Sequence, residues 1–145
     1  MSEKNEAVAR RLMDEVWNKG DLKLIDQLLT SDHMNNDPMN PGRGPEVLRE
    51  VVQKYRTAFP DCRFDIDELF SAGDKVVARW RYSGTHQKPL EGIPPTGRRV
   101  KGSGIAIHRF LGDRIQESYV NWDALGMMQQ LGVVTLPGKA AKAGA

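Results

Sequence analysis

The stretch GIAIHRFLGDRIQESYVNWDALGMMQQLG, residues 104–132, decides the fold of this chain. Its segments 104–110 and 114–122 are apolar and are predicted as two strands, joined by a turn around Leu111-Gly112-Asp113. A short helix should follow, because Asp123 is a suitable N-cap and Gly132 a suitable C-terminal stop. A long hairpin needs a layer packed on its apolar face, so we expect any pocket to have this hairpin as one wall.

Length and composition indicate one globular domain. The chain has 145 residues, of which 39% are hydrophobic and 28% charged, and we assign 1–134 to a single domain and 135–145, small and apolar-poor, to a mobile tail. A formal charge of +2 is too small to indicate nucleic-acid binding. The single Cys62 cannot form an internal disulfide, and no stretch resembles a signal peptide or membrane span. We therefore expect a soluble cytoplasmic protein with neither nucleic-acid nor membrane partners.

The first part of the chain has helical periodicity. Apolar residues at spacings of three and four predict an amphipathic helix that stops at 18–20, and a shorter helix capped by Asp21 should follow. Residues 30–45 are rich in Asn, Asp, Pro and Gly, which predicts a loop with at most a short strand around Met34. Pro45 then opens a third helix, which Pro60 ends.

From Asp61 the apolar period changes to two. Strands are predicted over 62–66 and 75–85 with a turn at 71–74, and a loop rich in Pro and Gly over 88–97 leads into the strand that continues into 104–110. Helices come first, then antiparallel strands, then a closing helix. This order predicts an α+β fold with the helices on one face of a curved antiparallel sheet.

Several short motifs carry a resemblance to a known family. They are 84–86 (GTH), the loop 92–98 (GIPPTGR), the hairpin that ends in Asp123, and Leu125-Gly126 followed by 130–132 (QLG). With these motifs the sequence resembles the SnoaL-like polyketide cyclases, within the superfamily shaped like nuclear transport factor two and ketosteroid isomerase. The resemblance implies a cone-shaped sheet wrapped around a long N-terminal helix, a ligand cavity at its open end, and a homodimer formed through the sheet.

The resemblance also implies a chemistry that needs no cofactor. In the cyclases an aspartate on the last strand is the acid/base of an intramolecular aldol closure, and polar side chains on the preceding strand support it. Counted back from the shared Leu-Gly, the aspartate's place is occupied by Val120, and the supporting places by Gly104 and Ala106. A valine cannot accept a proton. The resemblance therefore implies the family's cavity without its carboxylate base.

His108 continues the pocket parity of residues 104 and 106, and its partner depends on the hairpin register. A two-residue turn at Gly112-Asp113 would place His108 opposite Glu117, where the carboxylate could hold a general base with a pKa near neutrality. A three-residue loop would instead place His108 opposite Ser118, with Val120 and Trp122 on the same face, and the count from the family resemblance favours this second register. The pocket would then be mostly apolar and aromatic with one imidazole, which suits binding better than proton transfer.

Each candidate residue has a structural alternative. His108 and His86 could simply form structural hydrogen bonds, and His33 with its Asx-rich neighbours 35–37 could line the cavity mouth or satisfy turn backbones. The three histidines are too scattered for a metal site, and no phosphate loop or Ser-His-Asp order is present. The predicted catalytic residues are His108 and Glu117, and the predicted ligand contacts are Trp17, Asn36, Tyr55, Trp80, His86, Ala106, Ser118, Val120 and Trp122.

Two classes of function stay open at this point. One is a cofactor-free cyclase, isomerase or dehydratase that acts on a hydrophobic, oxygenated, polyketide-like small molecule by acid/base chemistry. The other is a protein that uses the same cone for ligand binding without turnover, or as a dimeric structural module.

Overall fold

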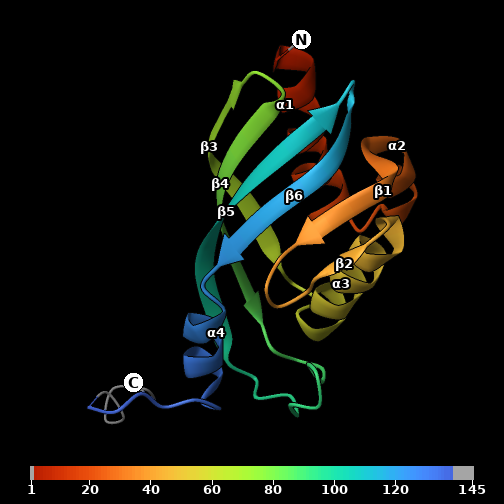
Figure 1. Cartoon of the computed structure of the whole chain (residues 1–145). Helices are drawn as coiled ribbons and strands as arrows, with labels where there is room; N and C mark the ends of the chain where they lie inside the picture. Colours follow the sequence, from red (N-terminus) through yellow and green to blue (C-terminus); the bar gives the residue numbers. More distant parts are fainter. Residues whose placement is uncertain (1, 139–145) are drawn as a thin grey trace.

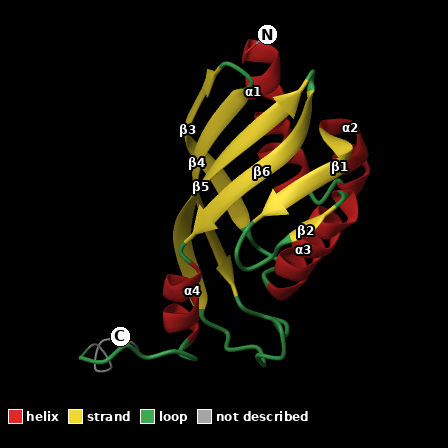
Figure 2. Cartoon of the chain, in the orientation of Figure 1, coloured by secondary structure: helices red, strands yellow, loops and turns green. Residues whose placement is uncertain are grey.

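The computed structural model describes residues 2–138 and contains one curved six-stranded sheet (Figures 1 and 2). The strand order is β2-β1-β6-β5-β4-β3. This architecture confirms the predicted α+β class. The strands are β1 (Leu29–Asn36), β2 (Gly42–Arg43), β3 (Arg63–Ala72), β4 (Lys75–Thr85), β5 (Arg99–Leu111) and β6 (Arg114–Trp122).

The helices lie in three places: behind the sheet, beside its β1/β2 edge, and at the end of β6 (Figure 1). Figure 1 shows α1 behind the sheet, α2 and α3 beside β1 and β2, and α4 where β6 ends. The first helix continues beyond α1 as a π-helical turn that ends at Trp17, close to the predicted stop. The helical segments are α1 (Ser2–Arg11), η1 (Leu12–Trp17), η2 (Leu22–Leu24), α2 (Ile25–Leu28), α3 (Pro45–Ala58) and α4 (Ala124–Leu131).

Strand β1 differs from the prediction in length and direction. The segment expected to be mostly loop is an eight-residue strand that pairs in parallel with β6, with Asn35 opposite Ser118. The sheet is therefore mixed, although its other pairings are antiparallel. Turn-forming composition misled the prediction because the polar side chains of His33 and Asn35 point inward and are buried there.

The β5/β6 hairpin combines features of both predicted registers. Its turn is the two-residue Gly112-Asp113, since Leu111 pairs with Arg114. The register then shifts between Arg109 and Phe110, and His108 lies opposite Ser118. One extra residue on β6, a β-bulge, has the same effect on register as a longer loop.

The ends of the helices lie where the capping and stop signals in the sequence predict them, with one exception. Helix α3 begins at Pro45, as predicted. At α4 the Asp123 carboxylate accepts a hydrogen bond of 2.8 Å from the backbone N–H of Gly126, and Gly132 ends the helix with a φ of 82°. Asp21 precedes η2 but makes no capping hydrogen bond, so its predicted capping role is wrong.

Two hydrophobic clusters form the core. One joins α1, η1, α2 and α3 to the turn end of the hairpin and includes Val16, Ile25 and Ile115. The other joins the end of α3 to α4 and the strands between them, and includes Phe59 and Leu131. No helix within 2–138 is long and apolar enough to cross a membrane. The predicted tail lies outside the described residues from position 139 onward.

The Asp123 cap gives a test of how the hairpin is joined to α4. Replacing Asp123 by Ala removes the acceptor for the Gly126 N–H and should lower the free energy of unfolding by about 1 kcal/mol. Asp123→Asn keeps a side-chain acceptor and should lose much less. Urea denaturation of both variants measures the difference, and equal stabilities would show that the cap contributes nothing.

Candidate functional site

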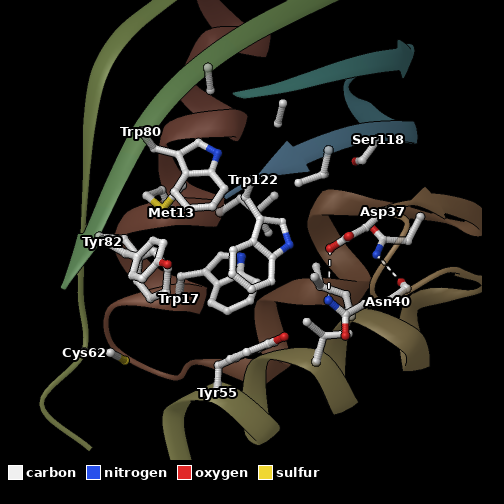
Figure 3. Close-up of a pocket in the computed structure, with 18 of the residues that line it drawn as sticks. Met13, Trp17, Asp37, Asn40, Tyr55, Cys62, Trp80, Tyr82, Ser118 and Trp122 are labelled. Atoms are coloured by element: carbon white, nitrogen blue, oxygen red, sulfur yellow. Dashed lines mark hydrogen bonds between the residues drawn. The ribbon is translucent and has the colours of Figure 1, made fainter. Parts of the chain in front are cut away.

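A cavity lies between the inner face of the sheet and the helices α1, η1 and α3 (Figure 3). It reaches both core clusters and is walled mostly by apolar and aromatic side chains. Its lining residues are Ala9, Leu12, Met13, Trp17, Leu29, His33, Asn35, Asp37, Asn40, Leu48, Val51, Tyr55, Phe59, Cys62, Phe64, Ala78, Trp80, Tyr82, Ser83, Gly84, Val100, Ala106, His108, Ser118, Val120, Trp122 and Met127.

Aromatic rings form a continuous wall at one end of the cavity. Successive ring centroids along this wall are 5.0 to 6.3 Å apart, in tilted or edge-to-face arrangements that aromatic pairs prefer. Gly104 makes room for two of them, because a Cβ at that position would collide with the Trp80 ring and with Cβ of Trp122. The wall consists of Trp17, Phe64, Trp80, Tyr82, Trp122 and Tyr55.

Two histidines meet at one serine on the strand side of the cavity. Ser118 Oγ is 2.9 Å from His33 Nε2 and 2.8 Å from His108 Nδ1. All three side chains are buried, with exposures of 1% for His33, 3% for Ser118 and 7% for His108. They come from three adjacent strands, because β6 lies between β1 and β5. His33 Nδ1 is also buried and has no hydrogen-bond partner among the described residues.

Burial keeps both imidazoles neutral at neutral pH. Loss of solvation lowers the pKa of His33 to about 4, against the opposing effect of the nearby Asp32 and Glu117 carboxylates. The pKa of His108 is also lowered to about 4, first by burial and then by the proximity of His33. Neutral imidazoles keep one N–H donor and one lone-pair acceptor each. The site can therefore both accept and donate hydrogen bonds at pH 7.

A second polar group lies at the β1 end of the cavity. The Asn40 side-chain N–H donates to Asp37 Oδ2 over 3.1 Å, and the Asn35 side chain donates to the Asn40 carbonyl over 2.8 Å (Figure 3). Lys54 Nζ fixes the Asn40 amide from outside, at 2.6 Å from its Oδ1, and also pairs with Glu91 Oε1 at 2.6 Å. The Asp37 carboxylate is thus held in place by an amide whose own orientation is fixed.

Most predicted ligand contacts lie on the cavity wall, whereas Asn36 and His86 do not. Asn36 follows Asn35 on β1, and because side chains alternate along a strand, Asn35 takes the cavity position. His86 is fully buried outside the lining, where its Nδ1 accepts from the Thr96 N–H at 3.2 Å. The predicted contacts that do line the cavity are Trp17, Tyr55, Trp80, Ala106, Ser118, Val120 and Trp122.

The predicted pairing of His108 with Glu117 does not form. The bulge on β6 places Glu117 opposite Arg109, and the two side chains make an ion pair of 2.6 Å. Glu117 is absent from the residues that line the cavity. The residue that contacts His108 is Ser118, which the second of the two predicted registers placed opposite it.

His33, Asn35 and Asp37 line the cavity but are not among the site residues predicted from the sequence. Their spacing of two is the signal that could have identified them, because residues at i, i+2 and i+4 share one face of a strand. The surrounding Asn, Asp and Pro residues concealed this signal. Within 2–138, no three His, Cys, Asp or Glu side chains are grouped as a metal site would require.

The depressed pKa values of the two histidines predict an acid-sensitive fold. In the unfolded chain these imidazoles titrate near 6.5, and in the folded protein at about 4. Between those values the unfolded state binds more protons, so the free energy of unfolding should fall as the pH decreases from 6.5 to 4. His108→Gln should make this slope shallower in urea denaturation series across that range. Equal slopes for the two proteins would contradict the buried neutral state of His108.

Comparison with known proteins gives a consistent result. The model of the family described as "SnoaL-like polyketide cyclase" matches residues 7–131. The chain is 31% identical over 127 residues to aklanonic acid methyl ester cyclase DnrD of Streptomyces peucetius, with 84% of this chain and 87% of that protein covered. It is 27% identical over 124 residues to nogalonic acid methyl ester cyclase of Streptomyces nogalater, with 83% and 92% covered.

A solved structure agrees with these sequence relatives. TsrD from Streptomyces laurentii superposes with a TM-score of 0.78 at 30% sequence identity, and the match covers 88% of this chain and 97% of that one. The family match spans both walls of the cavity, from α1 through β6 to α4. This chain belongs to the SnoaL-like polyketide cyclase family.

Proposed function

We propose that the protein binds a hydrophobic, oxygenated, polyketide-like small molecule in this cavity and acts on it by acid/base catalysis without a cofactor. The observation that carries the proposal is the presence of buried polar atoms without partners on side chains of a mostly apolar lining. His33 Nδ1 and the Tyr82 hydroxyl are buried without partners among the described residues. An unpaired buried polar group costs roughly 1–3 kcal/mol, and a ligand oxygen at each would offset that cost.

The charges around the cavity favour a neutral ligand over an anionic one. Asp37 is the one acidic side chain among the lining residues, and no Lys or Arg is among them. A ligand carboxylate would therefore be repelled by the Asp37 carboxylate, and no Lys or Arg of the cavity lining would compensate its charge. An ester of the same molecule avoids this repulsion, which agrees with the methyl ester named for the two sequence relatives.

His108 is the best candidate for the proton-transferring group. It lines the cavity, its Nδ1 is held by Ser118, and burial keeps its imidazole neutral. A neutral imidazole whose one nitrogen is engaged can exchange a proton at the other. Val120 lies two residues beyond Ser118 on the same wall and offers no such group. We infer that Val120 stands in the place of the family's aspartate and that His108 replaces its function.

The alternative is a protein that binds the same class of ligand without turnover. Two observations favour it: Val120 cannot accept a proton, and an imidazole with a pKa of about 4 is a weak base for removing a proton from carbon. The two functions require the same cavity and the same ligand, so only a turnover assay separates them.

A paired ligand series tests the proposal. Aromatic polyketide methyl esters should raise the melting temperature by several degrees. A ligand present at a hundred times its Kd adds about 2.7 kcal/mol to the free energy of unfolding. The matching free acids should shift it less, and product analysis of the hits then tests turnover. His108→Gln should abolish turnover while leaving Kd within about tenfold.

Each arm of this test has its own negative result. Equal shifts for ester and acid would contradict the charge argument, and unchanged turnover in His108→Gln would remove His108 from catalysis. Ligand binding without product would establish the non-catalytic alternative. A flat thermal-shift profile across esters, acids, steroids and fatty acids would contradict the ligand class itself.

We also propose that the protein is cytoplasmic, because a reducing compartment would keep Cys62 the free thiol that it is here. We further propose that it forms a homodimer through the outer face of the sheet. A row of paired residues crosses that face from β3 to β6 and leaves three large apolar side chains exposed. Their exposures are 52% for Phe70, 38% for Ile107 and 46% for Tyr119. Contact with a second copy would remove this apolar row from water.

Substitution in the middle of the row tests the dimer. Ile107→Asp should shift the mass measured by light scattering from dimer to monomer, because it buries a carboxylate in the interface. Leu125→Asp is the matched control, since Leu125 is 47% exposed but lies on α4. A monomeric wild-type protein, or a dimer that survives Ile107→Asp, would contradict the proposed interface.

A further inference from the structure

The hydrogen bonds of Ser118 restrict where the protons of the two histidines lie. A serine hydroxyl has a single hydrogen, so it can donate to only one of the two imidazole nitrogens that it contacts. The other nitrogen must then be an N–H that donates to Oγ. No third partner of the Ser118 hydroxyl is present among the described residues, so the hydrogen serves one of the two rings.

Two proton arrangements satisfy this restriction. In the first, His33 donates from Nε2 to Ser118, and Ser118 donates to His108 Nδ1, which leaves the His108 proton on Nε2. In the second, His108 donates from Nδ1 to Ser118, and Ser118 donates to His33 Nε2, which leaves the His33 proton on Nδ1. Because the serine contacts Nε2 of one ring and Nδ1 of the other, both rings carry their proton on the same type of nitrogen in either arrangement.

We propose that His33, Ser118 and His108 form a proton relay in which the two imidazoles share one tautomer and switch together, which makes His33 Nδ1 a second proton-exchange site for the ligand. This inference rests on the proposed acid/base function of His108. The geometry of the relay is independent of that function. It consists of two cavity-lining rings, one bridging hydroxyl and one buried ring nitrogen that has no partner within residues 2–138.

The relay allows a proton to enter at one ring and another to leave at the other. With both protons on Nδ1, the His108 Nε2 lone pair takes a proton from a ligand carbon. The His108 Nδ1 proton passes to Ser118 Oγ, the Ser118 proton passes to His33 Nε2, and the His33 Nδ1 proton passes to a ligand carbonyl oxygen. The electron pair of the broken C–H bond forms the new bond to the carbonyl carbon, and the carbonyl π pair becomes the O–H bond.

This sequence balances without a charged product. One proton enters and one leaves, so the relay ends neutral with both ring protons on Nε2, and exchange with water after product release restores the first arrangement. A neutral pathway suits this wall, because burial disfavours an imidazolium at either ring. In its resting state the relay offers the ligand one donor and one acceptor. It therefore matches a ligand with a carbonyl group near an acidic C–H or hydroxyl group, and not one with two donors.

Nuclear magnetic resonance of histidine-labelled protein tests the relay directly. Two-bond nitrogen–proton correlations distinguish an imidazole protonated on Nδ1 from one protonated on Nε2, and His33→Gln and His108→Gln assign the two rings. His86 is an internal reference for the Nε2–H form, because its Nδ1 accepts from the Thr96 N–H. The ligand-free wild-type protein at pH 7 should show the same tautomer, or the same mixture of tautomers, for His33 and His108.

Substitution of the bridge completes the test. Ser118→Ala should end the agreement between the two rings and lower kcat by about 100-fold on any methyl ester that is turned over, with KM little changed. Ser118→Thr retains a hydroxyl and should restore both properties. Opposite tautomers in the wild-type protein, or agreement that persists in a folded Ser118→Ala variant, would overturn the relay.

The two proposals fail in different ways. Opposite tautomers combined with turnover that depends on His108 would reject the relay and leave the proposed function intact. Matching tautomers combined with ligand binding and no product would support the coupling of the rings and reject catalysis. If Ser118→Ala does not fold, the wild-type spectrum alone still decides whether the rings share a tautomer.

Discussion

The register of β6 is the constraint on which the rest of the site depends. The bulge in the β5/β6 hairpin turns Ser118 inward between His33 of β1 and His108 of β5, and it turns Glu117 outward onto Arg109. A register one residue away would exchange the two faces of the strand. The inner wall would then hold a carboxylate and lose the hydroxyl that bridges the imidazoles.

The parallel pairing of β1 with β6 is the second requirement for this site. It brings a strand of polar residues from the N-terminal half of the chain to the one serine that faces inward from β6, with Asn35 opposite Ser118. Burial of His33 and His108 is tolerable because each has a hydrogen bond to Ser118, and because both stay neutral. Among the described residues, the buried His33 Nδ1 has no hydrogen-bond partner of its own.

The cavity combines this polar wall with an aromatic one. The rings around Trp80 and Trp122 pack on one another, and Gly104 gives them the space to do so. The aromatic wall supplies apolar area for a flat ligand, whereas the histidines and Asp37 supply a few polar contacts at defined positions. The chain shares its fold with the family, and the polar groups on the cavity wall determine which chemistry the cavity can support.

The sequence by itself determined the elements whose signals are local. Pro45 at the start of α3, the Asp123 cap, the Gly132 stop and the alternation along β5 were all predictable, because each depends on neighbouring residues or on a simple period. The class of fold followed from these elements, whereas the inward parity of His108 followed from the family resemblance, which placed residues 104 and 106 in the pocket, together with the alternation along β5. Only the tertiary structure decided that the Asx-rich segment after Leu29 is a strand, and that Ser118 rather than Glu117 contacts His108. Those two features depend on a parallel pairing between distant segments and on a bulge of one residue, and no local preference of the chain encodes either of them.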